Sequence, residues 1–476
     1  MNFLAKEHRS FLLFISFVAI LRLLIAPYVG FGVDEAHYVL YGIHLDWSYF
    51  DHPPLVGWVQ HFFTSLFGLN EFAARISAVL IGFITSLLLY KLIYGIDHNA
   101  KKSFIAVVAL YASFIFNVLF LMLMPDTLLF LLIIPIIFSV ISLEKDPSTK
   151  NWLLLGVLLG LAGLSKYTAV LFIIPIVLYL LIKKRFSLFY SPKMLLAIAT
   201  AFILIMPVIY WNILHHWISF TYQSNHVVGA SHIHWSGFFR SLAVQLVAYN
   251  PFLTPLAFYG LYKAFKSKND TLFLTALFGL TLISFFTYAS LYKTALPHWS
   301  ALFYLLFIPI GVYYFYDVAK KYVKYTLIFG LLLSLIAYAE LVFKFIPQPD
   351  YQSIHRDIYG WNSIMKHANA FIKDDTKDAI AVTNWTLASR ALFYNHPYKS
   401  KVYLIDKRKD QFDLWQKTSP LGKNLVVINT HFFHKNVKNY MKCETVSPLE
   451  HFDINISNHR VNSIDLVLCK NYQGIK

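Results

Sequence analysis

Long hydrophobic runs alternate with short polar gaps along the chain up to about residue 346. A helix needs about 20 mostly apolar residues to cross the hydrocarbon core of a bilayer. By this criterion the pattern predicts about eleven membrane spans. We place them near residues 11–30, 73–95, 103–122, 127–143, 152–164, 168–182, 194–211, 241–262, 271–290, 300–316 and 326–346. The predicted fold class is a mainly α, polytopic transmembrane helical bundle.

The hydrophobic run at 152–182 is too long for one ordinary span, and its sequence indicates where it divides. Gly156, Gly160 and Gly163 are followed by the polar pair Ser165-Lys166. We therefore predict a tight helical hairpin with Lys166 at its outer tip. Without this division, every later loop would change sides of the membrane.

The polar gaps fall into two classes that alternate along the chain. One class is basic and contains Lys6, Arg9, Lys101, Lys102, Lys145, Lys150, Lys183, Lys184, Arg185, Lys263, Lys266, Lys268, Lys320, Lys321 and Lys324. The positive-inside rule places these gaps, and with them the N-terminus, in the cytoplasm. The other class contains Asp34-Glu35, Asp51-His52, Asp126, Lys166, His215-His216 and Pro297-His298-Trp299. By alternation these lie outside, so the unusual polar residues gather on one face.

The first outer gap, residues 31–72, is too long to be a simple turn. We expect a short helix over 35–46 lying in the membrane surface, and a second interfacial stretch over Leu55–Phe67. Ionisable groups beside a bilayer are costly to desolvate, which makes them functional candidates. Two acidic clusters in this loop, with Asp126 on the next outer turn, favour function over ordinary interfacial charge.

After Phe345 the chain becomes polar and holds no predicted span. Strands are predicted at Ala379–Thr383, Val402–Ile405, Leu425–Ile428 and Ile464–Leu468, and helices at Asn384–Tyr394 and Gln411–Trp415. We therefore expect a transmembrane domain over residues 1–346 and a small extracytoplasmic α/β domain over 347–476. Cys443 and Cys469 lie in the second domain, either as a disulfide, which an oxidising compartment permits, or as two free thiols.

Composition agrees with a membrane protein. Hydrophobic residues make up 57% and charged residues only 14%, against about 25% charged in soluble domains. The formal charge of +16 would favour nucleic-acid binding in a soluble protein, but here the basic residues lie in short gaps and indicate topology. No nucleic-acid partner is predicted. The segment Phe11 to Gly30 lacks a small-residue cleavage signature, so we interpret it as a retained helix.

Several short motifs occur in a fixed order along the chain. They are Asp34-Glu35, Phe50-Asp51-His52-Pro53-Pro54-Leu55, Phe67-Gly68 with Asn70-Glu71-Phe72-Ala73-Ala74-Arg75, Met124-Pro125-Asp126, Gly160 through Tyr167, and Leu296-Pro297-His298-Trp299. This ordered set, over residues 1 to about 320, resembles the dolichyl-phosphate-mannose–protein mannosyltransferase superfamily. It is most similar to the bacterial branch that includes the lipid A aminoarabinose transferase. Gln411–Trp415 also looks like segments of bacterial members.

The resemblance implies a C-type glycosyltransferase fold and transfer of a sugar from a polyprenyl phosphate, with inversion, outside the cytoplasm. The proposed catalytic acid of the family corresponds to Asp34. Two departures stand out. This chain has Asp51-His52 where aminoarabinose transferases commonly carry Glu-Lys, which weakens an assignment to that substrate. It also lacks the large inserted lumenal domain of eukaryotic members, which favours a bacterial enzyme in the inner membrane, with its C-terminal domain in the periplasm.

The chemistry of such a transfer assigns roles to the outer residues. Asp34 is the candidate base, and Glu35 is a positioning group or second base. The leaving phosphate needs fixed positive charge at low dielectric. Its candidate ligands, near outer membrane ends, are Lys166, ranked first, and Arg75, Lys293 and His298. Substrate-positioning roles fall to Asp51, His52, Asp126 and Tyr167.

Each of these residues also has a structural alternative. For Arg75 the alternative is snorkelling at the start of a helix, for Lys293 it is anchoring at the interface, and for Asp126 it is capping the next helix. Arg22 either pairs inside the bundle or reaches the site. A divalent metal is an option, with His52 and His298 as possible ligands together with Asp51, His215, His216, His226, His232 and His234. No compact ligand spacing supports a metal, and no cofactor is required.

The sequence therefore favours a glycosyltransferase, with membrane lipids, a polyprenyl-phosphate sugar and a cell-envelope acceptor as partners. That acceptor is lipid A, another glycan or a protein. The alternatives are a transporter or flippase of lipid-linked sugars, or a lipid-linked glycan polymerase or ligase. Transporters place polar and broken-helix features near the bilayer midplane, often in repeated halves. Here the features line one face and no internal repeat is visible.

Overall fold

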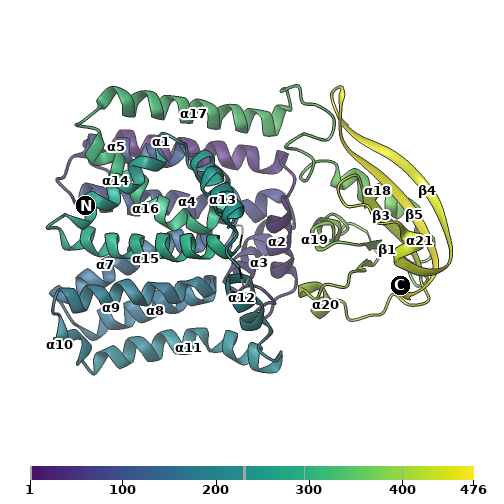
Figure 1. Cartoon of the computed structure of the whole chain (residues 1–476), viewed down its shortest axis with the longest axis horizontal. Helices are drawn as coiled ribbons and strands as arrows, with labels where there is room; N and C mark the ends of the chain where they lie inside the picture. The colour runs from purple at the N-terminus through teal and green to yellow at the C-terminus, as the bar shows by residue number, and fades with distance from the viewer. Residues whose placement is uncertain (1–2, 229–231, 294, 399) are drawn as a thin grey trace. The chain divides into compact units, whose positions relative to one another are not determined.

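The computed structural model describes residues 3–228, 232–293, 295–398 and 400–476, and the side chains of residues 225–228 also lie outside this description. The chain forms two compact units, one of helices and one that combines helices with a sheet (Figure 1). The first comprises Met1–Leu24, Asp46–Val59 and Phe72–Ala337, and the second Ile25–Leu45, Gln60–Glu71 and Tyr338–Lys476. The boundary after residue 346 stays a prediction.

Seven helical segments within the described residues are long and apolar enough to cross a membrane. They contain α1 (Arg9–Ile25), α4 (Glu71–Tyr94), α7 (Pro125–Lys145), α11 (Lys193–Leu214), α15 (Asp270–Tyr292), α16 (Ala301–Phe315) and α17 (Lys320–Phe343). Two shorter apolar helical segments, Thr149–Ser165 and Tyr167–Ile182, replace the long run at 152–182. The predicted division at Lys166 is therefore present: α8 (Thr149–Ser165) ends there, and η3 (Tyr167–Phe172) and α9 (Ile173–Ile182) follow.

The predicted count of eleven spans is not confirmed, because two of the predicted ranges are broken helices. The range 103–122 contains α5 (Ala100–Tyr111) and α6 (Phe114–Leu119), and 241–262 contains α13 (Trp235–Ala248) and α14 (Thr254–Phe265). Two buried amides bond the carbonyl groups freed at the first break. Asn117 Nδ2 donates to the carbonyl oxygen of Tyr111 at 2.8 Å, and Asn250 Nδ2 donates to that of Ala112 at 3.1 Å. Internal partners of this kind make a broken helix tolerable inside a membrane.

A buried arginine, Arg22, lies in the last turn of α1, within the first apolar helical segment. Arg22 Nη2 donates to Asn117 Oδ1 at 3.0 Å, and the guanidinium lies 5.1 Å from the centre of the Tyr111 ring. A charge at membrane depth needs such partners, because lipid offers none. Arg22 therefore pairs inside the bundle, which was one of the two alternatives that the sequence left open.

Close helix packing depends on glycine at one point. A Cβ on Gly311 of α16 would meet the carbonyl oxygen of Leu256 on α14 at 1.8 Å. Small residues let membrane helices approach closely, where dispersion and not water drives association.

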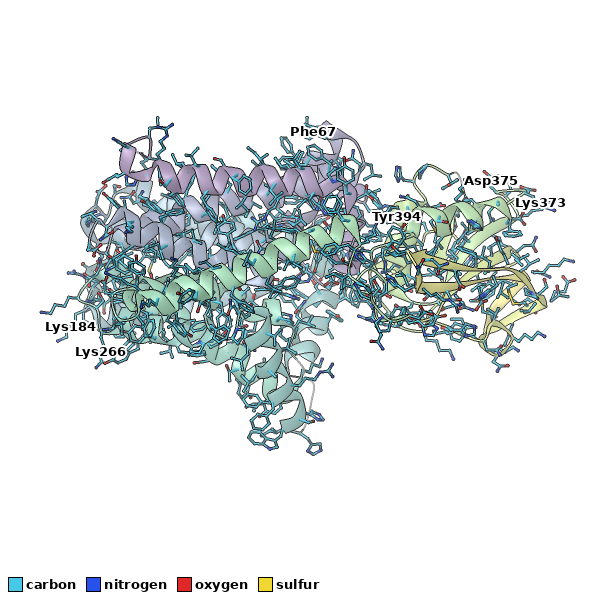
Figure 2. The ribbon with its side chains drawn as sticks, turned by 90° about the horizontal axis from the view of Figure 1, so that it is seen from above. Phe67, Lys184, Lys266, Lys373, Asp375 and Tyr394 are labelled. Carbon is cyan, nitrogen blue, oxygen red and sulfur yellow. A yellow bond between two sulfur atoms is a disulfide. The ribbon has the colours of Figure 1, made fainter. Side chains whose placement is uncertain are left out.

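At one end of the helical unit, Lys184 follows α9 and Lys266 follows α14 (Figure 2). Two of the predicted cytoplasmic gaps thus lie together.

The second unit contains a five-stranded sheet in the order β2-β1-β3-β5-β4. Strands β1 (Asp378–Val382), β2 (Val402–Leu404) and β3 (Asn424–Thr430) are parallel, and β5 (His459–Ile475) runs antiparallel to β3 and β4 (Met441–Ile456). The four predicted strands and the helices α19 (Trp385–Tyr394) and α20 (Gln411–Trp415) are confirmed. Strand β4 and the helices α18 (Trp361–Ala370) and α21 (Val437–Tyr440) were not predicted. Cys443 and Cys469, on the long β4–β5 ribbon, form a disulfide.

The first loop supplies two further helices, as its sequence predicted. These are α2 (Val33–Ile43) and α3 (Leu55–Phe67), and the 3-10 helix η2 (Ala26–Tyr28) precedes them. The α2 and α3 backbones approach closely where a Cβ on Gly42 would meet His61 N at 2.8 Å. Helix α2 packs against α19 within the second unit.

Candidate active site

A buried ion pair in the helical unit joins Lys166 and Asp126. Lys166 Nζ donates to both carboxylate oxygens of Asp126, at 2.7 Å and 2.8 Å. Both residues are buried, with Lys166 8% and Asp126 3% exposed. The backbone explains the placement: α8 stops at Ser165, Lys166 is extended, and Asp126 lies in the first turn of α7. Met124 occupies the N-cap of α7, so the alternative that Asp126 caps this helix is wrong.

Two histidines adjoin this ion pair. His298, on η4 (Pro297–Ser300), has its Nε2 4.0 Å from Asp126 Oδ2, and His52 also interacts electrostatically with Asp126. The Asp126 carboxylate thus has Lys166 and the two histidines around it, in a buried place where electrostatic interactions are strong. Lysine has three N–H donors, and two of them bond Asp126, so the third is available to an anion. The cluster can therefore bind a phosphate while Asp126 fixes the ammonium in place.

Tyr167 lies beside Lys166 among small polar groups from three segments. Its hydroxyl is 3.2 Å from Ser48 Oγ, and Ser219 and Asn212 are within hydrogen-bonding reach. Ser219 Oγ also donates to the carbonyl oxygen of Tyr49 at 2.8 Å, which ties this region to the loop that carries Asp51 and His52.

That loop is fixed through its backbone. Gln223 Nε2 donates to the carbonyl oxygen of Asp51 at 2.6 Å, and Tyr49 N donates to the carbonyl oxygen of His52 at 3.1 Å. Sequence reasoning missed Ser48, Asn212, Ser219 and Gln223, because isolated serines and amides in apolar segments give no distinctive signal. Their position next to Pro53-Pro54 and the His215-His216 pair was the only hint in the sequence.

An apolar groove of about 670 Å³ continues from Tyr167 between α8, α9 and α11. Its walls include Leu159, Gly163, Val177 and Ile205. Gly163 and Tyr167 flank Lys166 in the chain, so one end of the groove lies next to the ion pair. An apolar groove of this size suits a lipid chain.

The other candidate phosphate and metal ligands of the helical unit lie in separate places. Arg75 is buried at 1% exposure in the first turns of α4, which excludes simple snorkelling to the surface. Lys293 is the C-cap of α15 and is half-buried. His215 stacks on Trp211 with ring centres 3.8 Å apart, and the side chain of His226 lies outside the described residues. Across the described ranges, no three His, Cys, Asp or Glu side chains gather as a metal site.

Asp34 and Glu35 belong to the second unit, on the first turn of α2. Glu35 is buried, and its Oε2 accepts a hydrogen bond from the backbone N of Gly32 at 3.4 Å, which caps the helix. Asp34 is half-buried. Carboxylates at a helix N-terminus are stabilised by the helix dipole.

Aromatic residues of the polar C-terminal segment hold α2 in place. His37 lies 5.5 Å from Phe412 and 5.8 Å from Trp385 between ring centres, and its Nδ1 is 3.4 Å from Ser389 Oγ. Trp415 contacts Tyr41, one turn further along α2, with ring centres 5.8 Å apart. The helix that carries Asp34 is thus packed against α19 and α20, more than 340 residues later in the chain.

Helix α20 begins at a carboxylate in an unusual environment. Asp410 is its N-cap and accepts a hydrogen bond from the backbone N of Phe412 at 2.9 Å. Burial raises the pKa of Asp410 to about 6. At the other end of α2, burial and the nearby charge of Lys417 lower the pKa of His44.

Comparison with solved structures identifies the class of protein. The fold matches ArnT from Cupriavidus metallidurans bound to undecaprenyl phosphate with a TM-score of 0.68 at 13% identity, over 97% of this chain and 98% of that chain. The apo form of that ArnT gives a TM-score of 0.66 at 14% identity. The protein is therefore a multi-pass membrane protein with the C-type glycosyltransferase fold.

Sequence comparison finds related proteins over part of the chain. The model of the dolichyl-phosphate-mannose-protein mannosyltransferases matches residues 51–211. The lipid A galacturonosyltransferase RgtD of Rhizobium johnstonii is 29% identical over 194 residues, which is 39% of this chain and 39% of that relative. The chain thus aligns with about two fifths of the curated relative's length. Both partial matches are to glycosyltransferases, and they agree with the resemblance of the ordered motifs to the bacterial branch of the dolichyl-phosphate-mannose–protein mannosyltransferase superfamily.

Proposed function

We propose that the protein is an inverting glycosyltransferase that moves a sugar from a polyprenyl phosphate to an acceptor of the cell envelope. The observation that carries this proposal is the buried Lys166–Asp126 pair next to an apolar groove. The groove suits a polyprenyl chain, and the third N–H of Lys166 suits its phosphate. The similarity to a lipid A galacturonosyltransferase and to an ArnT bound to undecaprenyl phosphate supports this choice of donor and favours a lipid acceptor.

In the proposed reaction, an acceptor oxygen attacks the anomeric carbon while the bond from that carbon to the phosphate oxygen breaks. Asp34 accepts the proton when the acceptor is a hydroxyl, and Glu35 keeps the helix start in place. An acceptor phosphate is already ionised and needs no base. The leaving polyprenyl phosphate gains negative charge, which Lys166 stabilises at low dielectric, with help from His298. Tyr167, Asp51 and His52 position the sugar.

The proposed location is the bacterial inner membrane, with the N-terminus in the cytoplasm and the second unit in the periplasm. Two observations support this orientation. The basic gaps at Lys184 and Lys266 lie at one end of the helical unit, as the positive-inside rule requires of cytoplasmic loops (Figure 2). The disulfide between Cys443 and Cys469 suits an oxidising compartment.

The test is product analysis with membranes that contain the protein and a polyprenyl phosphosugar. Wild-type protein should release polyprenyl phosphate and glycosylate a lipid extract. Asp34→Asn should lower this rate by about 10²-fold or more with a hydroxyl acceptor, because it removes the base. Asp46→Asn is the matched control, since Asp46 lies in the same loop and, among the described residues, its carboxylate accepts a hydrogen bond only from the backbone N of Trp47, at 2.7 Å. Intact donor moved across the bilayer without product would instead indicate a transporter.

A further inference from the structure

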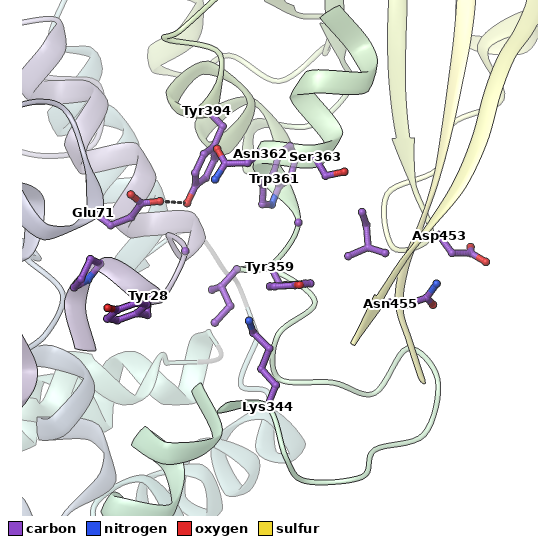
Figure 3. Close-up of a pocket in the computed structure, with 15 residues that line it drawn as sticks. Tyr28, Glu71, Lys344, Tyr359, Trp361, Asn362, Ser363, Tyr394, Asp453 and Asn455 are labelled. Carbon is purple, nitrogen blue, oxygen red and sulfur yellow. Dashed lines mark hydrogen bonds between the residues drawn. The ribbon is translucent and has the colours of Figure 1, made fainter. Parts of the chain in front are cut away.

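A second cavity lies wholly within the second unit and has no role in the reaction proposed above (Figure 3). Its volume is about 470 Å³, within the range of about 300–1,000 Å³ that small-molecule sites occupy. Segments far apart in the chain line it: the end of η2, Glu71, Lys344, the turn before α18, the end of α19 and strand β4. A sugar-sized ligand fits this space.

Aromatic rings form much of the wall, and one is rigidly held. Tyr28, Tyr359, Trp361 and Tyr394 all line the cavity. Trp361 Nε1 donates to the carbonyl oxygen of Asp357 at 3.2 Å, and the guanidinium of Arg390 lies 4.8 Å from its ring centre. Rigid rings offer flat apolar faces at low entropic cost, which suits the C–H faces of a sugar.

A hydrogen-bonded chain fixes Tyr394 and Glu71 on the wall. The backbone N of Phe31 donates to the Tyr394 hydroxyl at 3.0 Å, and that hydroxyl donates to Glu71 Oε1 at 2.9 Å (Figure 3). The loop comes this close because residue 30 is glycine: a Cβ on Gly30 would lie 1.9 Å from the carbonyl oxygen of Ile358. This chain holds the Glu71 side chain in place. Its second oxygen, Oε2, accepts no hydrogen bond from any residue in the described part of the chain.

Lys344 is the cation of this cavity. Its Nζ lies 4.1 Å from the centre of the Tyr359 ring, and within the described residues no carboxylate is within 4.0 Å of it. Burial lowers the pKa of Lys344, so an anion that paired with it would favour its charged form. Three further polar side chains on the wall form no side-chain hydrogen bond among the described residues: Asn362, Ser363 and Asn455.

The cavity also lies at the membrane ends of two spans. Tyr28 ends the first apolar helical segment, Lys6–Tyr28, and Lys344 directly follows α17, the last one. Both residues line the cavity, so it adjoins the points where the chain leaves two apolar helical segments. We propose that this cavity binds the phosphorylated sugar headgroup of a membrane glycolipid, with the sugar against the aromatic rings, its hydroxyls on Glu71 and the phosphate on Lys344.

The test measures binding to the full-length protein in lipid nanodiscs, without any donor, so it is independent of sugar transfer. Glucosamine 1-phosphate and glucosamine are the soluble probes, followed by saturation-transfer NMR and calorimetry. Wild-type protein should prefer the phosphorylated sugar by about tenfold, the size expected of one charge-assisted hydrogen bond. Lys344→Met should remove this preference and keep the weaker binding of glucosamine. Lys366→Met, an exposed lysine of α18, should behave as wild type.

A second variant and a lipid arm separate a headgroup site from other sources of binding. Tyr28→Leu should weaken both sugars equally by about threefold or more, since Tyr28 is 68% exposed and contributes a ring face and not a charge. Nanodiscs that contain a phosphorylated glucosamine lipid should compete with the soluble probe, and discs of phosphatidylglycerol alone should not. Equal competition by phosphatidylglycerol, or an unchanged phosphate preference in Lys344→Met, would overturn the proposal.

Discussion

The Lys166–Asp126 pair can be tested as a functional unit and not only as a structural one. Replacing Lys166 by Met leaves the Asp126 carboxylate, 3% exposed, without its ammonium. Breaking a buried ion pair from one side costs about 3–5 kcal/mol, because a charge stays buried alone. Asp126→Leu alone should cost a similar amount. Replacing both residues by apolar groups removes both charges together and is often nearly neutral.

A double-mutant cycle therefore separates the two roles of the pair. The unfolding free energies of wild type, Lys166→Met, Asp126→Leu and the double variant are measured in detergent, alongside polyprenyl phosphate release. The double variant should recover stability to within about 1–2 kcal/mol of wild type. Its activity should still be about 10²–10³-fold lower, because the leaving phosphate has lost its fixed positive charge. A stable double variant with wild-type activity would show that the pair is only structural.

Three further predictions concern the second unit. Asp410 has a folded pKa of about 6 against about 3.9 in an unfolded chain, so its contribution to stability is fully present below pH 4 and is lost as pH rises to 6. Asp410→Asn keeps the N-cap and removes the buried charge. Its free energy of unfolding should exceed that of wild type by up to about 2 kcal/mol at pH 8 and should equal it at pH 4. Replacing Cys443 and Cys469 by Ser opens a loop of 26 residues and should cost about 3 kcal/mol of stability. Trp415→Ala should lower turnover by about tenfold with little change in donor binding, because it loosens the helix that carries Asp34.

Each of these predictions has its own control. Asp410→Ala removes the buried charge and also the cap, so it should be less stable than Asp410→Asn by about 1 kcal/mol at both pH values, and equal stability of the two variants would contradict the capping role. Reductant should change the melting temperature of wild type but not of the double serine variant. Trp415→Phe keeps an aromatic contact with Tyr41 and should retain most activity, and equal loss in both variants would refute the positioning role.

The sequence predicted the helical architecture well, because a membrane span depends on composition over about 20 residues and on little else. The division at Lys166 followed from polar residues inside an overlong run. The breaks near Ala112 and Asn250 could not be predicted in the same way. The break near Ala112 is stabilised by the side chains of Asn117 and Asn250, which bond the freed carbonyl groups of Tyr111 and Ala112, and hydropathy does not report such partners.

The sequence indicated which residues could form the candidate site, but not which of them contact one another. Lys166 and Asp126 were both chosen from the sequence, yet their direct contact joins positions 40 residues apart and depends on where α7 begins and where α8 ends. The support of α2 was less predictable still. His37 and Trp415 meet only because the chain returns after α17, and the tail motif Gln411–Trp415 gave no indication of its partner.

The central claim is that the protein breaks a sugar–phosphate bond and does not merely move an intact lipid. The most direct measurement is mass spectrometry and NMR of lipids from purified protein reconstituted with a polyprenyl phosphosugar and an envelope lipid. We predict one polyprenyl phosphate released per glycosylated acceptor, with the opposite anomeric configuration in the product. An intact donor recovered on both sides of the vesicle, with no glycosylated lipid, would contradict the account.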